Sequence, residues 1–302
     1  MDHIIETNKL SKKYGRQFAL KDASISIPKG SIYGLVGRNG AGKTTFMRLI
    51  TGLQKPSEGD YRIFGMDYRD KEIVRQRKRI GALIEKPGIF ADLNAYSNIK
   101  TQYINLGLPS YDGIDELLEL VGLSGTGKKL AGMFSLGMKQ RLGIAIALAG
   151  SPDLLVLDEP INGLDPEGIV NIREMLLKIN RERGTTILIS SHILGELEHL
   201  ATDYAFIEKG RIVEQISAEE MKRKCRKSTL LRVTKPETFC KILDDMEIEY
   251  QVTAENELTL YGDFTLSDVV IAASKEGADV LSSTVNDENL ESYFLDIIGG
   301  RE

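Results

Sequence analysis

The residues most able to do chemistry lie in one glycine-rich segment. Its eight residues, Gly37 to Thr44, fit the pattern G-x-x-x-x-G-K-[ST], and they stand between an expected strand and an expected helix. Glycines let backbone N–H groups point around phosphate oxygens, and the helix N-terminus adds the positive end of its dipole. Lys43 supplies a charge for the β- and γ-phosphates, and Thr44 offers a hydroxyl to Mg²⁺. The segment predicts a phosphate loop with these binding residues: Gly37, Asn39, Gly40, Ala41, Gly42, Lys43, Thr44 and Thr45.

Two neighbouring carboxylates, Asp158 and Glu159, follow the apolar run Leu154 to Leu157. That run predicts a buried strand, and open α/β sheets hold their ligands at the carboxyl ends of such strands. We expect Asp158 to hold the Mg²⁺ shell and Glu159 to act as general base on a water in line with the γ-phosphate. The alternative is a pair of solvated carboxylates at a strand end, but the phosphate loop in the same chain favours the catalytic interpretation.

The elements that must position these residues alternate between strand and helix. The first thirty residues alternate polar and apolar, which predicts antiparallel strands. Later apolar runs are separated by helical patterns, an order that favours a parallel sheet, and 90–150 reads as helical throughout. The predicted core strands are 31–36, 154–157 and 185–190, with a closing hairpin over 204–207 and 212–215. Residues 1–218 therefore predict an α/β domain with an antiparallel β subdomain and a helical insert.

A different order of elements follows a basic stretch at 219–227, which we interpret as a linker. From residue 229 the pattern runs strand, helix, strand, strand, helix, strand, with a last helix to Ile298. This βαββαβ order predicts a small α+β, ferredoxin-like domain over 228–302. Residues 236–302 carry 16 acidic and 3 basic side chains, whereas the rest of the chain has a net charge of +8. The basic stretch could contact anionic lipid or nucleic acid, but a solvated linker or helix face is the interpretation we favour.

Composition excludes several classes of protein. With 302 residues, 42% of them hydrophobic and 27% charged, the chain has the composition of a globular protein of about two domains. No apolar run approaches the roughly 18 residues that a membrane-spanning helix needs, and the acidic N-terminus lacks the features of a secretory signal. Cys225 and Cys240 are too few for a disulfide framework. We therefore expect a reduced, cytosolic setting.

Further motifs give the chain a family resemblance. Phe134 to Arg141 reads FSLGMKQR just ahead of the acidic strand, Ile161 to Asp165 follows that strand, and His192 follows the next predicted strand. Together with Tyr14 and the phosphate loop, these motifs stand in the order found in the nucleotide-binding subunits of ATP-binding cassette (ABC) transporters. Residues 1 to about 218 resemble that family, which implies a P-loop, RecA-like ATPase core that binds ATP and Mg²⁺.

The resemblance also implies roles for single residues. Ser135 and Gly137 would belong to the signature that completes the ATP site of a second subunit, and Asp165 would shape that opposite site. His192 would sense the γ-phosphate, and Tyr14 would stack on adenine. Two nucleotide-binding subunits, identical or different, would then close on ATP head to tail. A monomer is therefore expected to be a poor ATPase.

Two departures from the family pattern narrow the resemblance. Leu136 and Met138 replace the Gly and Gln of the usual signature, and Glu85 replaces a Gln that normally bridges the Mg²⁺ region and the membrane partner. Ionised Glu accepts hydrogen bonds only and binds hard cations more strongly, so we expect Glu85 to approach Mg²⁺. With these residues the chain resembles the branch of ABC ATPases that serves bacitracin export and lantibiotic immunity.

This branch works with separately encoded membrane permeases, so the resemblance implies a cytoplasmic subunit that sits on the inner face of the membrane through its permease. Two other hypotheses remain open. One is an ABC ATPase without a transport role that acts on nucleic acid or the ribosome or as a regulator, although nucleic acid is not the partner we expect. The other is a P-loop kinase or GTPase, which would leave the signature and His192 unexplained.

Overall fold

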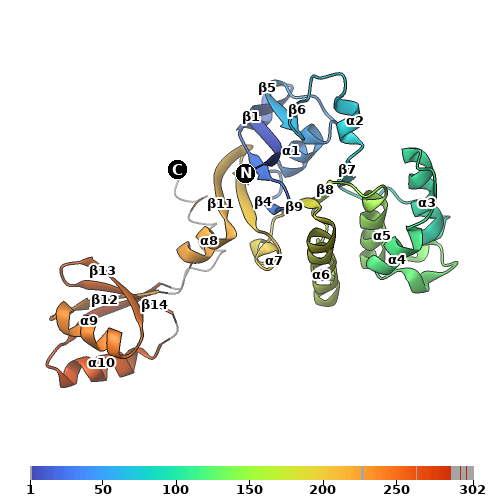
Figure 1. Ribbon diagram of the computed structural model, residues 1–302. Helices are drawn as coiled ribbons and strands as arrows, with labels where there is room; N and C mark the ends of the chain where they lie inside the picture. The colour runs from blue at the N-terminus through green and yellow to red at the C-terminus, as the bar shows by residue number, and fades with distance from the viewer. Residues whose placement is uncertain (1, 226–227, 263, 287–292, 294–296, 298–302) are drawn as a thin grey trace. The chain divides into compact units, whose positions relative to one another are not determined.

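The computed structural model describes residues 2–225, 228–262, 264–286, 293 and 297. The chain divides into two compact units, Met1–Ala218 and Glu219–Glu302 (Figure 1). Within the described residues, none of the helices is both long enough and apolar enough to span a bilayer.

A six-stranded sheet forms the centre of the larger unit. Its strand order is β11-β10-β4-β9-β8-β7, and every neighbouring pair is parallel except β10 with β11. The strands are β4 (Ile32–Val36), β7 (Ile80–Leu83), β8 (Leu154–Asp158), β9 (Thr186–Ser191), β10 (Asp203–Glu208) and β11 (Arg211–Ser217). All residues of β4, β8 and β9 are buried, which explains why these strands are continuous apolar runs in the sequence.

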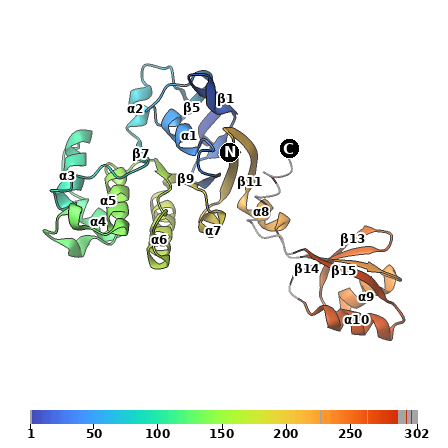
Figure 2. The ribbon, with the colours of Figure 1, turned by 180° about the vertical axis from the view of Figure 1, so that it is seen from behind.

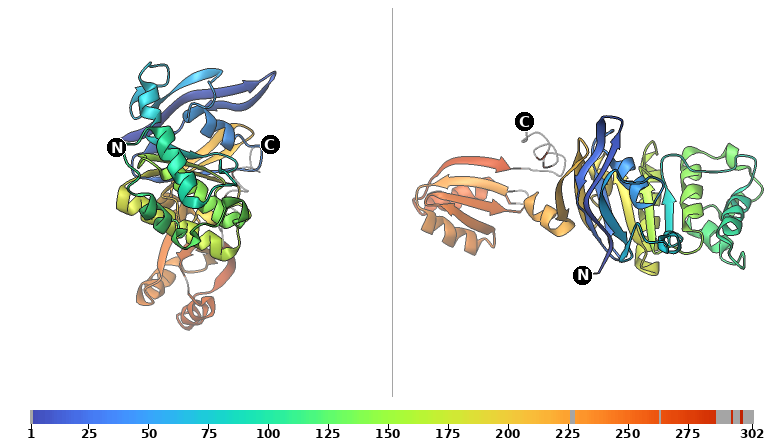
Figure 3. Two further views of the ribbon diagram at one scale, coloured as in Figure 1. Left: turned by 90° about the vertical axis from the view of Figure 1, so that its right-hand side faces the viewer. Right: turned by 90° about the horizontal axis from the view of Figure 1, so that it is seen from above.

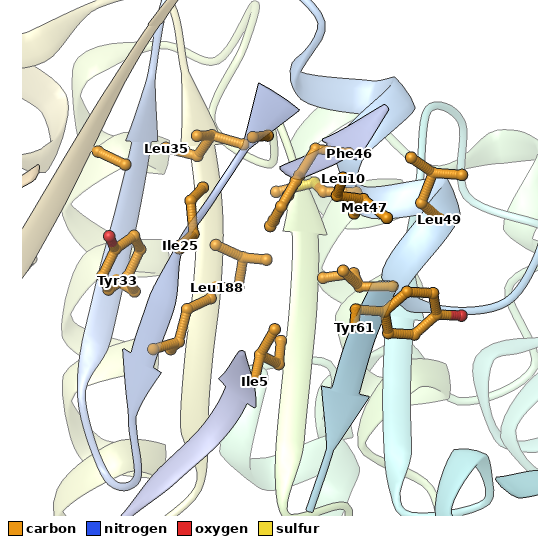
Figure 4. Packing of buried hydrophobic residues seen from close by; sticks show 14 of the residues in the cluster. Ile5, Leu10, Ile25, Tyr33, Leu35, Phe46, Met47, Leu49, Tyr61 and Leu188 are labelled. Carbon is orange, nitrogen blue, oxygen red and sulfur yellow. The ribbon is translucent and has the colours of Figure 1, made fainter. Parts of the chain in front are cut away.

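A second, antiparallel sheet packs over the first in the same unit. It contains β1 (His3–Tyr14), β2 (Gln17–Ala23), β3 (Ser26–Pro28), β5 (Glu58–Ile63) and β6 (Met66–Asp67). Helix α1 (Lys43–Ile50) shares one buried cluster with both sheets (Figure 4). Ile5 and Leu10 come from the antiparallel sheet, Phe46 from α1, and Leu35 and Leu188 from the parallel sheet. This core fixes the start of α1 against the end of β4.

Helices connect the parallel strands, and one group of them forms the predicted insert. Between β7 and β8 the chain forms α3 (Ala95–Leu106), α4 (Ile114–Leu120) and α5 (Leu136–Leu148), which lie together at one end of the larger unit (Figure 3). The remaining helices of this unit are α2 (Ile73–Arg77), α6 (Pro166–Arg183) and α7 (Leu194–Leu197). The predicted α/β architecture, with an antiparallel subdomain and a helical insert, is confirmed.

Helix α8 (Ala218–Lys224) starts at the last residue of the larger unit and continues into the smaller one, so much of the segment interpreted as a linker is helical. A four-stranded antiparallel sheet follows, in the order β13-β14-β12-β15, with α9 and α10 packed on one face (Figure 2). Its elements are β12 (Ser228–Val233), α9 (Pro236–Asp245), β13 (Glu249–Ala254), β14 (Glu257–Tyr261), α10 (Leu266–Lys275) and β15 (Val280–Asn286). This is the βαββαβ order expected of a ferredoxin-like domain. Most of the last predicted helix lies outside the described residues.

Candidate active site

The glycine-rich loop joins β4 to α1 and depends on glycine at two close approaches. Gly42 has φ 113°, and a Cβ atom there would lie 2.6 Å from the Ala19 carbonyl oxygen. A Cβ atom on Gly37 would lie 2.3 Å from the Ile207 carbonyl oxygen. Both distances are far below a van der Waals contact, so the backbone fold of this loop excludes a larger residue. Asn39 and Gly40 are exposed at the outside of the loop, whereas Ala41 is buried beneath it.

Lys43 is the buried cation of the site. Its side chain is only 5% exposed, and its ammonium group donates hydrogen bonds to the carbonyl oxygens of Gly37 at 2.6 Å and Arg38 at 3.2 Å. The same Nζ lies 3.0 Å from Oε1 of Glu159. A buried ammonium group requires such partners because it has lost most of its hydration.

Two strands and α1 bring a set of oxygen atoms together beside Lys43. The Thr44 hydroxyl donates to Oδ2 of Asp158 at 2.6 Å, and the Ser190 hydroxyl donates to Oδ1 of the same carboxylate at 2.6 Å. Asp158 and Ser190 are register partners at the ends of β8 and β9. Hard cations prefer oxygen ligands, so the Thr44 hydroxyl and the Asp158 carboxylate fit Mg²⁺.

Glu159 lies between two groups that can carry positive charge. Its Oε1 contacts Lys43, and its Oε2 is 2.6 Å from Nδ1 of His192, the residue directly after β9. Glu159 has φ 50°, a left-handed conformation that is uncommon for residues other than glycine and turns the chain sharply after β8. The Ser190 hydroxyl also accepts a hydrogen bond from the Glu159 N–H at 2.9 Å, which fixes this turn.

Ser190 is the member of this site whose role sequence reasoning missed. Its hydroxyl bridges the side chain of Asp158 and the backbone of Glu159. One signal in the sequence could have identified Ser190. It is a polar residue at the carboxyl end of an apolar run, and that run is the next one in the chain after the acidic strand and its helix. Neighbouring parallel strands present their carboxyl ends at the same edge of a sheet.

The signature segment and the loop after β8 form a separate cavity of about 370 Å³. Ser135 is the N-cap of α5 and accepts a hydrogen bond from the Met138 N–H, and Asp165 is the N-cap of α6 and accepts one from the Gly168 N–H. Both helix N-termini border the cavity, so it combines backbone donors with a positive dipole end. The residues that line it are Ser135, Leu136, Gly137, Arg141, Gly163, Leu164, Asp165, Glu167, Gly168, Asn171 and Ile172.

Leu136, the first departure from the usual signature, lies against the loop after β8. A Cβ atom on Gly163 would approach its Cδ2 to 3.2 Å, and Gly163 has φ 76°. Gly137 keeps an open approach, since a Cβ atom there would meet only Leu164, at 3.5 Å. The extra side chain thus lies beside a residue that has no side chain of its own, and the backbone at Gly137 stays accessible.

Two predicted residues have their polar partners outside the oxygen cluster. Tyr14 ends β1 with 46% of its surface exposed, and its hydroxyl donates to Oε1 of Gln54, which leaves an accessible ring for stacking. Glu85 pairs with Arg48 of α1, and its side chain is 59% exposed. Arg48 was not among the predicted site residues, because nothing in its local sequence indicates this partner.

The comparisons with known proteins agree with this arrangement. The model of the protein family described as ABC transporter matches residues 20–162 of this chain. The bacitracin transport ATP-binding protein BcrA of Enterococcus faecalis is 40% identical over 99% of this chain and 98% of its own length. The lantibiotic transport ATP-binding protein SrtF of Streptococcus pyogenes is 45% identical over 70% of this chain and 89% of its own length.

A solved structure, cbiO1 from Clostridium perfringens, part of the ABC transporter complex cbiONQ, has a TM-score of 0.67 at 27% identity. It covers 82% of this chain, which in turn covers 97% of that structure. Fold and site thus define a P-loop ATPase of the cassette type. The chain belongs to the family of ABC transporter ATP-binding proteins, and it is an ATP-binding ATPase that resembles the bacitracin and lantibiotic branch.

Replacing Gly42 by Ala tests the loop geometry. The new Cβ atom would collide with the Ala19 carbonyl oxygen at a left-handed φ, so the loop must shift. We expect ATP affinity to fall at least about tenfold, measured by equilibrium binding of a fluorescent ATP analogue. Gly125→Ala is the matched control, because a Cβ atom there meets nothing within 4 Å. Equal affinities in the two variants would contradict the close-approach argument.

Proposed function

We propose that two copies of this chain, or this chain and a similar subunit, close on ATP to power a separate membrane permease that exports a peptide antibiotic or lantibiotic. Export of such a peptide would make the cell resistant or immune to it. The ATPase part is supported by one observation above others: the Glu159 carboxylate lies between Lys43 and His192, next to the Thr44–Asp158 pair. The transport part is supported by the similarity to bacitracin and lantibiotic transport proteins.

In this proposal the chain's own residues share the work as follows. Backbone N–H groups of the loop and the Lys43 ammonium group bind the β- and γ-phosphates, and Tyr14 stacks on the adenine. Thr44 and Asp158 hold Mg²⁺, which neutralises phosphate charge when it is bound. Glu159 takes a proton from the attacking water, and His192 holds the Glu159 carboxylate in place.

The contacts of Glu159 suggest how ATP switches the site on. Lys43 pairs with Glu159, and a γ-phosphate bound at the loop would compete for the same ammonium group because it carries more negative charge. The Glu159 carboxylate would then lose one of its two partners and could accept a proton from water. His192, on the other oxygen, would keep the carboxylate oriented during this exchange.

The signature cavity lies on different elements from the phosphate loop, so the proposed second contact comes from another subunit. Ser135 and the N–H groups at the start of α5 would bind the γ-phosphate held by the partner's loop, with Gly137 allowing a close backbone approach. Asp165 would shape the same interface. A single cassette would then lack half of its site and hydrolyse ATP poorly.

Replacement of Glu159 by Gln tests the catalytic role. The amide has nearly the same shape but cannot accept a proton at neutral pH, so we expect ATP hydrolysis to fall at least about 100-fold. ATP should still bind and hold the subunits together, which size-exclusion chromatography with light scattering would show as an ATP-dependent dimer. Glu174→Gln, an exposed carboxylate on α6, is the control. Unchanged hydrolysis in Glu159→Gln would remove Glu159 from this role.

The same variant tests the transport assignment. Tagged Glu159→Gln protein would be purified with Mg-ATP from gently solubilised membranes of the host, and the proteins that accompany it would be identified by mass spectrometry. We expect a polytopic membrane permease, which would place the chain at the cytoplasmic face of the membrane. Recovery of ribosomes, nucleic acid or soluble partners alone would contradict transport and leave the ATPase chemistry intact.

Glu85 is proposed to link the metal region to the permease, as the Gln at this position does in the family pattern. Its pairing with Arg48 fixes it beside α1, whose first turn carries Lys43 and Thr44. In the nucleotide-bound state we expect Glu85 to turn from Arg48 toward Mg²⁺. The positive φ of 65° at Glu85 sets a sharp backbone turn at this point.

Replacing Glu85 by Gln tests this role. Loss of the carboxylate charge should raise the Mg²⁺ concentration for half-maximal ATPase activity about tenfold, as is typical of groups near a metal. It should also reduce stimulation of the ATPase by the permease. The control is Glu58→Gln, an exposed carboxylate on β5. If neither the Mg²⁺ dependence nor the coupling changed, the proposed role would be wrong.

A further inference from the structure

His192 reaches Glu159 from the first residue after β9. Its Nδ1 lies 2.6 Å from Oε2 of Glu159, although its side chain is 28% exposed. Packing alone does not fix a ring that is partly in solvent, so the orientation of this ring also depends on the backbone that carries it. Ser191, the last residue of β9, is only 3% exposed. The buried Ser191 is thus the anchor from which His192 projects.

The Ser191 hydroxyl closes a turn across His192. It accepts a hydrogen bond from the Ile193 N–H at 2.9 Å, so the residues on either side of His192 are tied to each other. A hydroxyl has one proton to donate, and two acceptors lie within reach: Oε2 of Glu196 at 2.7 Å and the Ile193 carbonyl oxygen at 3.0 Å. The carboxylate is nearer, and charged acceptors form the stronger hydrogen bonds. Glu196 therefore sets the direction of the Ser191 hydroxyl.

Glu196 is carried by a short helix that the core holds in place. It belongs to α7, in which Leu194 and Leu197 are buried. The Leu197 carbonyl oxygen accepts a hydrogen bond from the Tyr204 hydroxyl at 3.0 Å, which joins α7 to β10. On β4, a Cβ atom at Gly34 would approach Cδ1 of Leu197 to 3.1 Å, so α7 packs closely on that strand. Glu196 thus contacts Ser191 from a fixed backbone.

The backbone of Ser191 also contacts the phosphate loop. Its carbonyl oxygen accepts a hydrogen bond from the N–H of Gly37, the first residue of the loop, at 3.2 Å. The same loop leads to Lys43, which pairs with Glu159. Ser191 therefore joins the two segments that carry the partners of Glu159, namely Lys43 and His192. A shift of Ser191 would move one of these partners relative to the other.

We propose that Ser191 and Glu196 are positioning residues for His192. Together they hold its Nδ1 atom toward the Glu159 carboxylate while ATP is hydrolysed. The inference rests on the catalytic roles proposed above for Glu159 and His192, and it adds the contacts that fix them. Because the two positioning residues act through His192, their loss slows hydrolysis and leaves ATP binding unchanged. Small errors in the placement of a catalytic group lower the rate steeply.

Substitutions at the two positions test the inference in the full-length chain. In Ser191→Ala the turn loses its tie to Ile193, so we expect kcat for Mg-ATP hydrolysis to fall at least about tenfold. ATP affinity, measured with a fluorescent analogue, should stay within about twofold of the wild type, which also shows that the variant is folded. Glu196→Ala should lower kcat only about threefold, because the hydroxyl can still donate to the Ile193 carbonyl oxygen. Glu196→Gln keeps an acceptor oxygen and should hydrolyse ATP at the wild-type rate.

The matched control is Glu198→Ala, which removes an exposed carboxylate directly after α7. We expect its kcat to equal that of the wild type. An unchanged kcat in Ser191→Ala would overturn the inference. The same holds if ATP affinity falls as much as kcat, or if Glu196→Gln is as slow as Glu196→Ala.

A double variant separates this inference from the proposed role of His192. If Ser191 acts through His192, adding Ser191→Ala to His192→Ala should lower kcat no further. A further fall of about tenfold would show that Ser191 acts elsewhere, which would overturn the inference and leave the role of His192 intact. If His192→Ala alone hydrolysed ATP at the wild-type rate, the proposed role of His192 would fail together with the inference.

Discussion

The ion pair between the Lys43 ammonium group and the Glu159 carboxylate is the interaction on which the site depends. A cation that is 95% removed from solvent must be compensated, and two carbonyl oxygens of the loop together with Glu159 provide that compensation. The same pair joins the first motif of the chain to the acidic strand more than a hundred residues later. A phosphate that replaces Glu159 as the partner of Lys43 changes the contacts of both motifs at once. This ion pair is therefore where nucleotide binding can control the site.

The two sheets hold Lys43 and Glu159 at a fixed distance from each other. Helix α1 is clamped between the antiparallel and parallel sheets through Phe46 and Met47, so Lys43 and Thr44 in its first turn cannot shift freely. Strands β8 and β9 lie side by side in register, which brings Asp158 against Ser190 and carries Glu159 and His192 just beyond the sheet. Apolar packing thus sets the positions of the elements that carry the polar side chains of the site.

Most residues of this site could be predicted because the motifs that identify them are short, continuous stretches of the sequence. The phosphate loop requires glycines at fixed spacing, and a short continuous apolar run such as Leu154 to Leu157 favours a buried strand. Ser190 and Arg48 were missed because their contacts depend on strand register and on the approach of α1 to the loop after β7. Glu85 illustrates the limit: its residue type predicted a place near the metal, whereas the structure pairs it with Arg48, and its role there remains a prediction.

The signature segment shows why a departure from a family pattern has to be judged on its packing. A leucine in place of glycine adds a side chain to the wall of the signature cavity, where Leu136 is 54% exposed. Its Cδ2 also lies beside Gly163, a residue without a side chain and with a left-handed backbone, and the next glycine, Gly137, keeps its open surface. Leu136 and Gly163 are thus coupled: a side chain at 163 would displace Leu136. The unusual signature and the loop after β8 form one packing unit, so neither can be interpreted from its own motif alone.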